Sequence, residues 1–300
     1  MSADIIGRLA RGERLLCDGA MGTMLFRHGV RAGECPERLN LDEPETIEDV
    51  ARSYLDAGAD VILTNTFGGS PLRLSQFGLE NKYEKINKKA VRWARQAIGD
   101  KAILAASIGP SGGMLEPYGD IDPSQMYDSF HKQIKILLSE GVDMLMVETM
   151  TDISEARLAI KAARDQSGTI PLTATMTFEK TPKGYYTTMG VSVGQAAQDL
   201  TAAGANLIGS NCGNGIDSMI EIAREFKKHT ELPLIIQPNA GLPSMRDGRL
   251  VYPESPEYMA GKLPNLLKID VSVVGGCCGT TPNHIRAFRK VLNEYHKSSS

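Results

Sequence analysis

The sequence has few of the features that place a chain in a membrane, on nucleic acid or among disulfide-rich secreted proteins. No apolar run reaches the roughly 18 residues of a membrane-spanning helix, and the charged N-terminus lacks the apolar centre of a signal peptide. The 33 basic and 36 acidic residues nearly balance, which leaves no electrostatic footprint for nucleic acid or an anionic membrane. We therefore expect a cytoplasmic protein with small neutral or zwitterionic partners, and neither nucleic acid nor a membrane among them.

The sequence also lacks the short motifs that bind common cofactors. It contains no G-x-G-x-x-G dinucleotide fingerprint, no P-loop and no D-x-H-x-x-G cobalamin motif. Its five cysteines are odd in number and have no disulfide-framework spacing, so in a reducing compartment they are free, metal-bound or catalytic. The simplest interpretation of any one of them is a small buried apolar residue.

What the sequence does contain is a regular alternation of two patterns. Short apolar runs rich in β-branched residues are each followed by a polar or glycine-containing turn, and then by a segment with apolar residues at helical spacing. We predict eight strands within residues 14–20, 60–69, 102–110, 143–150, 171–178, 206–213, 233–241 and 271–279. We predict helices within residues 45–57, 83–98, 124–139, 154–164, 216–228 and 282–295.

This alternation predicts an α/β fold, a single (β/α)8 TIM barrel, with one domain over residues 1–300. Three helices lead into strands through glycine turns at residues 57–60, 140–143 and 203–206, where glycine supplies the left-handed conformation that a helix C-terminus needs. The alternative is an open doubly wound sheet, which the missing dinucleotide and phosphate motifs disfavour.

Three of the five cysteines stand at predicted strand ends. Cys212 ends the sixth strand, and Cys277 and Cys278 end the eighth. Because catalytic groups of such barrels lie at the C-terminal ends of the strands, we expect these thiols to meet at the barrel mouth. Three thiolates suit zinc, which sulfur binds at about 2.3 Å, and three protein ligands leave a fourth position open, which is typical of a catalytic site.

The adjacent cysteines pose a geometric problem, because neighbouring residues of a regular strand point to opposite faces. Gly275, Gly276 and Gly279 flank the pair and would allow an irregular turn that aims both sulfurs inward. Buried structural thiols and a strained vicinal disulfide are the alternatives. Cys17 and Cys35 lack such partners, and we expect them to be structural.

Polar residues at other strand ends suggest the kind of ligand. Asp18 and Glu148 are carboxylates suited to a substrate ammonium group, although Asp18 could instead bond turn amides and Glu148 could pair with a nearby cation. The loop that begins with Gly19 and Ala20 offers backbone N–H groups to a carboxylate. Together these groups would recognise an α-amino acid. We expect His284 to be a helix-start residue without a catalytic part.

Seven segments of the chain resemble the homocysteine S-methyltransferase family, and most closely the homocysteine-binding domain of cobalamin-dependent methionine synthases. They are LLCDGAMGT, GADVILTNTFGG, SIGPSGGMLEP, VETMTDISEA, NLIGSNCG, QPNAGLP and GGCCGTTPNHI, and the similarity extends over about residues 10–293. The resemblance implies a zinc-binding (β/α)8 barrel with one Zn²⁺ per chain, whose three thiolate ligands correspond to Cys212, Cys277 and Cys278. It also implies substrate contacts: Asp18 and Glu148 would hold the amino group of homocysteine, and Asn239 would fill the fourth zinc position until substrate displaces it.

The resemblance further implies an activity, in which homocysteine binds as a zinc thiolate and accepts a methyl group to form methionine. We expect a methyl-corrinoid protein as the donor, with methylcobalamin supplied only through that partner. S-Methylmethionine or S-adenosylmethionine is the alternative donor. A corrinoid-system methyltransferase or demethylase subunit acting on another substrate is a second alternative. A non-catalytic zinc scaffold would need a fourth ligand, and only three suitable cysteines are present.

Overall fold

Eight parallel strands form the centre of the protein in a computed structural model that describes residues 4–31, 33–246 and 249–299. In sheet order they are β1 (Leu15–Leu16), β12 (Val273–Val274), β9 (Leu234–Gln237), β8 (Leu207–Asn211), β5 (Leu172–Met176), β4 (Met144–Met150), β3 (Ile103–Ile108) and β2 (Val61–Leu63). The two edges meet through a parallel bridge between Cys17 and Val61, and the Asp60 N–H donates to the Leu16 carbonyl at 2.7 Å. The predicted (β/α)8 barrel is therefore confirmed, and each predicted strand segment contains one barrel strand.

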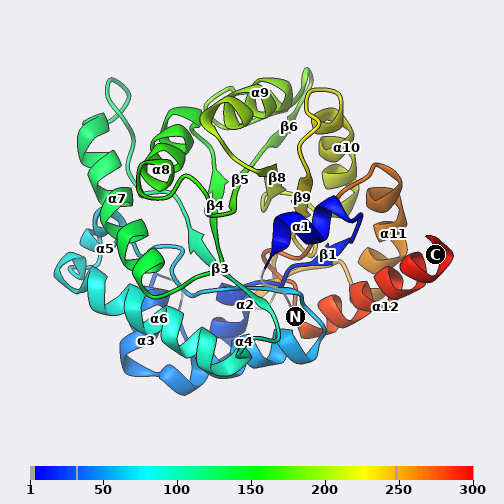
Figure 1. The fold of residues 1–300 in the computed structure, drawn as a ribbon, viewed down its shortest axis with the longest axis horizontal. Helices are drawn as coiled ribbons and strands as arrows, with labels where there is room; N and C mark the ends of the chain where they lie inside the picture. The colour runs from blue at the N-terminus through cyan, green and yellow to red at the C-terminus, as the bar shows by residue number, and fades with distance from the viewer. Residues whose placement is uncertain (1–3, 32, 247–248, 300) are drawn as a thin grey trace.

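Long helices surround this ring of strands (Figure 1). They are α4 (Pro44–Asp56), α6 (Tyr83–Ile98), α7 (Pro123–Ser139), α8 (Ile153–Gln166), α9 (Val193–Ala203), α10 (Ile216–Lys227), α11 (Pro256–Lys268) and α12 (Pro282–Ser299). Shorter elements are α1 (Ile5–Ala10), α2 (Met21–Arg27), α3 (Leu39–Asp42), α5 (Pro71–Ser75), η1 (Pro36–Arg38) and η2 (Glu80–Lys82). The predicted helices are all present, with ends shifted by at most two residues except at the end of α12.

Local sequence explains where several helices begin and end. The side chains of Asp152 and Ser255 accept N–H groups from the first turns of α8 and α11, as good N-caps do. Gly58, Gly141 and Gly204 follow α4, α7 and α9 with φ angles of 97°, 79° and 102°. The predicted left-handed turns are therefore present, and each delivers the chain directly into the next strand.

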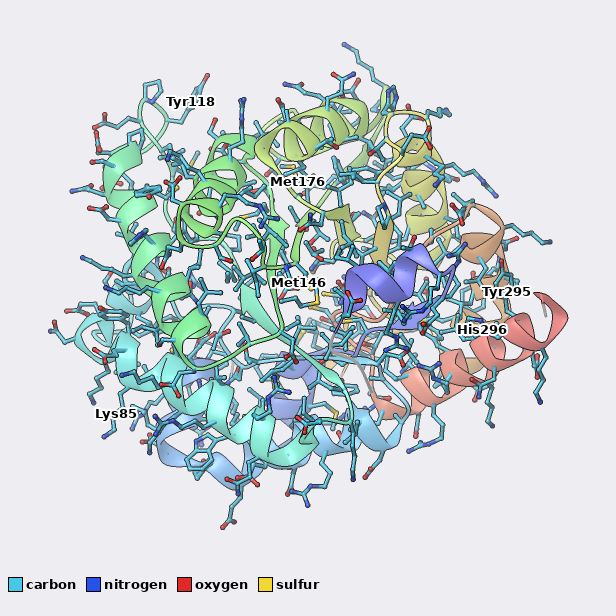
Figure 2. The ribbon with its side chains drawn as sticks, in the orientation of Figure 1. Lys85, Tyr118, Met146, Met176, Tyr295 and His296 are labelled. Atoms are coloured by element: carbon cyan, nitrogen blue, oxygen red, sulfur yellow. The ribbon has the colours of Figure 1, made fainter. Side chains whose placement is uncertain are left out.

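Side chains of the strands alternate between an inner core and an outer core. Met146 belongs to the cluster inside the ring, whereas Met176 packs between the strands and the helices (Figure 2). Ile5 of α1 joins the inner cluster and contributes to closing the barrel at the N-terminal ends of its strands. Polar groups lie at the opposite end, where the C-terminal ends of the strands lead into their loops.

Two hairpins that the sequence patterns did not predict extend loops at that opposite end. β6 (Glu179–Thr181) pairs with β7 (Gly184–Tyr186) after β5, and β10 (Ser244–Arg246) pairs with β11 (Arg249–Val251) after β9. No helix in the described part of the chain has the length and apolar character needed to cross a membrane.

Candidate metal centre and substrate site

The three cysteines at the ends of β8 and β12 lie together. The Sγ atoms of Cys212, Cys277 and Cys278 are all within 4.8 Å of one another, and those of Cys212 and Cys278 are 3.8 Å apart. Three sulfurs at tetrahedral zinc distances would be separated by about 3.8 Å. Over the described residues, this is the one cluster of three or more cysteine, histidine or acidic side chains with metal-site spacing. The expected meeting of the three thiols is therefore observed.

The backbone beyond β12 removes the geometric problem of adjacent cysteines. β12 ends at Val274, so Cys277 and Cys278 lie outside the regular strand. The Cys277 N–H donates to the Pro238 carbonyl at 2.8 Å, and the Ala240 N–H donates to the Cys278 carbonyl at 2.9 Å. These bonds tie the cysteine loop to the segment that follows β9.

The glycines around the cysteine pair play two different roles. Gly279 has a φ of 83°, in the left-handed region that the predicted turn requires. Gly275 and Gly276 instead provide room: a Cβ on Gly276 would lie 2.3 Å from Thr280 Oγ1, and one on Gly275 would lie 2.8 Å from the Cys17 Cβ. The absence of a side chain at Gly275 lets the loop approach the chain just after β1, and its absence at Gly276 lets the loop fold closely against its own Thr280.

The three thiols form hydrogen bonds with one another, and the Cys212 and Cys278 sulfurs are 3.8 Å apart. The bonds from Cys277 and Cys278 lower the pKa of the Cys212 thiol far below its usual range. The same bonds, together with burial, raise the pKa values of the Cys277 and Cys278 thiols. The cluster therefore favours a thiolate at Cys212, and a bound cation would favour ionisation of the other two thiols as well.

Asp18 lies at the end of β1 with only 2% of its surface exposed. Its Oδ2 accepts the Leu63 N–H at 2.8 Å, and its Oδ1 faces the Cys17 thiol at 3.5 Å. Burial raises the pKa of Asp18 to about 7. The N–H that Asp18 accepts thus comes from strand β2 and not from a turn, and the other carboxyl oxygen has only a weak thiol contact.

Glu148 lies on the inner face of β4 and is 7% exposed. The Ser107 hydroxyl donates to Oε1, and the Asn211 amide nitrogen lies 3.3 Å from Oε2. Burial raises the pKa of Glu148 to about 8. Within the described residues neither Glu148 nor Asp18 forms an ion pair with a basic side chain, which leaves both carboxyl groups available to a cationic ligand.

The loop after Asp18 is packed tightly and only partly available to a ligand. The Ala20 N–H already donates to Thr280 Oγ1 at 3.2 Å. A Cβ on Gly19 would lie 2.8 Å from that oxygen and 2.9 Å from the Tyr54 ring. Because α2 begins at Met21, the amides of its first turn have no partner within the helix and could receive a ligand.

Asn239 is 4% exposed, and its Oδ1 has no hydrogen-bond partner within the described part of the chain. Buried amide oxygens are nearly always paired, so an unpaired one is a candidate for contact with a ligand or metal. The Asn239 side chain also helps to lower the pKa of the Cys212 thiol, which puts its amide next to that sulfur. His284 bonds Thr281 at 3.1 Å and the Glu254 carbonyl at 3.1 Å, and this buried pairing agrees with the expected structural role.

Two residues to which the sequence analysis assigned no role belong to the site. Ser107 and Asn211 both contact Glu148. Alternation along the strands was the signal for them, because Ser107 follows the inward-facing Ala105 by two positions and Asn211 follows the inward-facing Leu207 by four.

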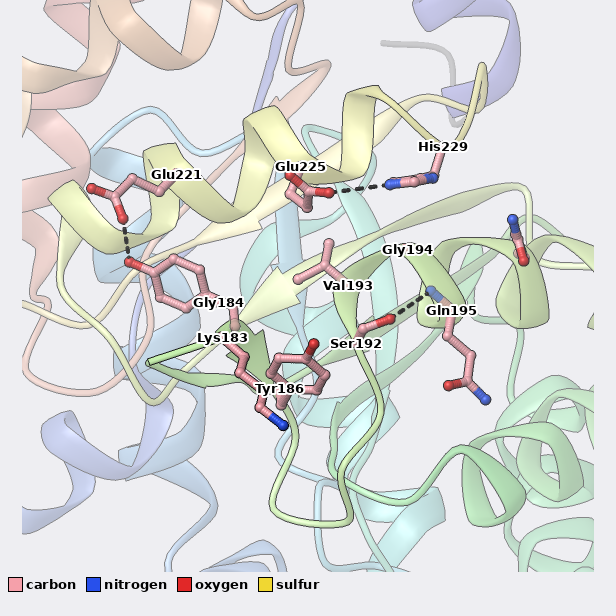
Figure 3. A pocket seen from close by; sticks show the side chains of 12 residues that line it. Lys183, Gly184, Tyr186, Ser192, Val193, Gly194, Gln195, Glu221, Glu225 and His229 are labelled. Carbon is pink, nitrogen blue, oxygen red and sulfur yellow. Dashed lines mark hydrogen bonds and ion pairs between the residues drawn. The ribbon is translucent and has the colours of Figure 1, made fainter. Parts of the chain in front are cut away.

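A separate hollow of about 680 Å³ lies on the flank formed by the β6–β7 hairpin, α9 and α10 (Figure 3). Both acidic side chains that line it have hydrogen-bond partners on its walls: Glu225 Oε1 lies 3.1 Å from His229 Nε2, and Glu221 accepts the Tyr185 hydroxyl at 2.6 Å. The strand ends that carry the cysteines do not line it.

A (β/α)8 barrel with convergent thiols and buried carboxyl groups at the C-terminal ends of its strands is the arrangement of a barrel enzyme. Comparison with known proteins identifies the family to which this barrel belongs. The model of the homocysteine S-methyltransferase family matches residues 15–292. The chain belongs to this family, as the resemblance of its sequence segments predicted.

Relatives in the family include much longer proteins. The chain is 31% identical to the methionine synthase of Mycobacterium leprae (strain TN) over 300 residues, covering 94% of this chain and 24% of the relative. It is 32% identical to the methionine synthase of Mycobacterium tuberculosis (strain ATCC 25618 / H37Rv) over 286 residues, covering 90% and 24%. The chain thus spans about a quarter of the length of these curated relatives.

Solved structures support the fold. The metallated form of the Escherichia coli homocysteine methyltransferase MmuM superposes with a TM-score of 0.77 at 22% identity, covering 95% of this chain and 98% of that one. The oxidized form of the same protein gives 0.78 at 23% identity, covering 96% and 99%.

Proposed function

We propose that this chain binds homocysteine as a methyl acceptor and converts it to methionine, using Zn²⁺ held by Cys212, Cys277 and Cys278. The observation that supports this most is the convergence of three sulfurs at one end of a barrel that also carries two buried carboxyl groups without ion-pair partners. Membership of the homocysteine S-methyltransferase family supports homocysteine as the acceptor.

The donor atoms fit zinc. Three thiols lie within 4.8 Å of one another, and the unpaired Oδ1 of Asn239 is a fourth candidate donor next to Cys212. When bound there, zinc would supply a Lewis acid that keeps a substrate thiol ionised at neutral pH, where a free thiol of pKa about 8.5 is mostly protonated. We propose one ion per chain.

The carboxyl groups of Asp18 and Glu148 would bind the substrate ammonium group. Burial makes both retain a proton up to pH 7 or 8 in the absence of a cation. An ammonium group beside them favours the ionised form, so we expect substrate binding near neutral pH to release a proton from this pair. The Ser107 hydroxyl and the Asn211 amide orient Glu148 for that contact.

The substrate carboxylate would lie near Gly19 and Ala20. Because Thr280 already accepts the Ala20 N–H, the amides that would receive the carboxylate are those of the first turn of α2. This arrangement would hold an α-amino acid at both of its charged groups while its side-chain sulfur extends toward the cysteines.

We propose a methyl-corrinoid protein as the methyl donor, because the sequence resembles the cobalamin-dependent branch of the family. S-Methylmethionine or S-adenosylmethionine is the alternative donor. In either case the thiol sulfur attacks the methyl carbon, the bond between that carbon and the donor breaks, and the bonding electrons leave with the donor.

A methyl-transfer assay of the zinc-loaded protein tests this proposal. Homocysteine is supplied with methylcobalamin, S-methylmethionine or S-adenosylmethionine, and methionine is measured, with Cys277→Ala as the inactive control. Methionine formed from methylcobalamin supports the first donor, and methionine formed only from a sulfonium compound supports the alternative. Failure with every donor contradicts the proposal, and methylation of another thiol in place of homocysteine indicates a different acceptor.

A further inference from the structure

Asn211 is the last residue of β8, directly before Cys212, and its side chain is completely buried. Its Oδ1 accepts the Thr149 N–H at 2.9 Å and the Thr175 hydroxyl at 2.7 Å. Because a backbone N–H can only donate, this pair of contacts fixes which way round the amide lies. The amide nitrogen must therefore face the opposite side.

On that side the Asn211 nitrogen meets groups from two parts of the proposed site. It donates to Thr149 Oγ1 at 2.7 Å, and it lies 3.3 Å from Glu148 Oε2 and 3.9 Å from Cys277 Sγ. One amide thus reaches both a carboxylate proposed to bind the substrate and a sulfur proposed to bind the metal.

The backbone has unusual φ angles near Asn211, both at the end of β4 and directly after β8. Thr149 and Cys212 have φ angles of 62° and 59°, although neither is glycine. A β-branched threonine in this region is a clear outlier, and such conformations persist only where surrounding contacts hold them. The pairing of β4 with β5 shifts register between Val147 and Met150, and the Asn211 side chain receives the Thr149 N–H there.

We propose that Asn211 is a positioning residue that holds the Glu148 carboxylate and the Cys277 sulfur at a fixed separation through a single side-chain amide. This inference rests on the proposed function, in which those two groups bind the two ends of one substrate. An N–H group directed at a thiolate also withdraws charge from the sulfur, so Asn211 would tune the ligand as well as place it.

The test compares Asn211→Ser with Asn40→Ser. Asn40 is an equally buried asparagine whose amide bonds the Asn65 and Ile86 carbonyls, away from the cysteines. Both variants lose a buried amide and should lose stability. Each is loaded with Co²⁺, whose thiolate charge-transfer absorption reports on the sulfurs, and homocysteine binding is measured by calorimetry.

We expect Asn211→Ser to move the charge-transfer band to longer wavelength, because the sulfur loses a hydrogen-bond donor, and to weaken homocysteine binding by about tenfold or more. Asn40→Ser should change neither. If Asn211→Ser does not fold, the isosteric Asn211→Asp, which removes the same N–H donors, is measured in its place.

An unchanged band or unchanged homocysteine affinity in a folded Asn211 variant overturns the proposal, as do equal changes in Asn40→Ser. The proposed function fails in a different way. If wild-type protein shows no thiolate band with Co²⁺, the metal site is refuted and this inference with it. If the wild type takes up Co²⁺ but binds no homocysteine, the acceptor is wrong, and the band alone then decides whether Asn211 acts on Cys277.

Discussion

The Sγ atoms of Cys212 and Cys278 lie 3.8 Å apart, although the two residues are 66 positions apart in the chain. β9 makes this possible because it pairs with β8 on one side and with β12 on the other. The segment after β9 then bonds the backbone of Cys277 and Cys278. The thiol cluster therefore depends on the correct order of three strands, and any ion that binds it should also stabilise the fold.

Replacing any one of Cys212, Cys277 and Cys278 by alanine should abolish stable zinc binding. Two thiolates and an amide oxygen make a much weaker site for this borderline-soft ion, so we expect zinc content to fall from about one per chain to near zero after dialysis. Elemental analysis of the purified variants measures this. Cys35→Ala is the control, because Cys35 is buried in a separate core cluster and should leave zinc content unchanged. Full zinc content in any of the three variants would show that its thiol is not a ligand.

Glu148→Gln and Asp18→Asn should weaken homocysteine binding and leave zinc in place. Removing one carboxylate that faces a buried ammonium group typically costs about 2 kcal/mol or more, so the dissociation constant should rise by about 30-fold or more. Calorimetric titration of the zinc-loaded variants measures this.

The matched control for those two variants is Glu155→Gln. Glu155 is also a buried carboxyl group, 4% exposed, but it accepts the Ser111 N–H on another part of the barrel. It should lose stability and bind homocysteine as the wild type does. Loss of zinc from the Glu148 or Asp18 variants would instead assign those residues a structural role in the metal site.

The pKa values of Asp18 and Glu148 predict how stability depends on pH in the protein without zinc or substrate. Burial raises these pKa values to about 7 and about 8, whereas unfolding returns both to about 4. Between pH 4 and 8 the folded state therefore binds more protons than the unfolded state, so these groups make the free energy of unfolding fall as pH rises. Their contribution is fully present below about pH 4 and is lost as pH rises through 7 to 8.

Denaturant unfolding at several pH values checks the sign of this effect. Wild type should lose more stability between pH 5 and 8 than Glu148→Gln does, by on the order of a few kcal/mol, because glutamine cannot ionise. Equal pH dependence in the two proteins would mean that Glu148 is already ionised in the folded state near neutral pH.

The barrel could be predicted from sequence because its strands are buried on both faces. Continuous apolar runs such as the one in residues 143–150 mark such strands, and glycines such as Gly204 mark the helix ends that precede them. The β6–β7 and β10–β11 hairpins were missed because they lie in loops outside the core, where neither apolar alternation nor burial constrains the sequence.

The thiol cluster was also predictable, whereas the polar contacts around it were not. Cys212 and the adjacent pair stood at strand ends, and barrel geometry alone brings such ends together. The contacts of Glu148 with Ser107 and Asn211 depend on strand register, and the positive φ of Thr149 depends on contacts with another strand. No local pattern encodes a conformation that only tertiary packing can hold.

Alanine substitutions at the glycines of the cysteine loop should reduce both stability and zinc affinity. Gly276→Ala would place a Cβ 2.3 Å from Thr280 Oγ1, and Gly279→Ala would place one 2.2 Å from the Tyr252 ring at a φ of 83°. Both changes must move the loop that carries the sulfurs, so we expect a loss of about 1 to 3 kcal/mol in stability and weaker zinc binding.

The control for this pair is Gly261→Ala, the same chemical change at an exposed position of α11 where a Cβ would meet nothing within 4 Å. It should leave zinc affinity unchanged and stabilise the helix by up to about 1 kcal/mol. Thermal unfolding with and without zinc, together with a competitive zinc titration, distinguishes the variants of the cysteine loop from this control. Unchanged zinc affinity in Gly276→Ala would mean that the loop can shift away from Thr280 without displacing Cys277, and that close packing within the cysteine loop does not set the positions of the thiols.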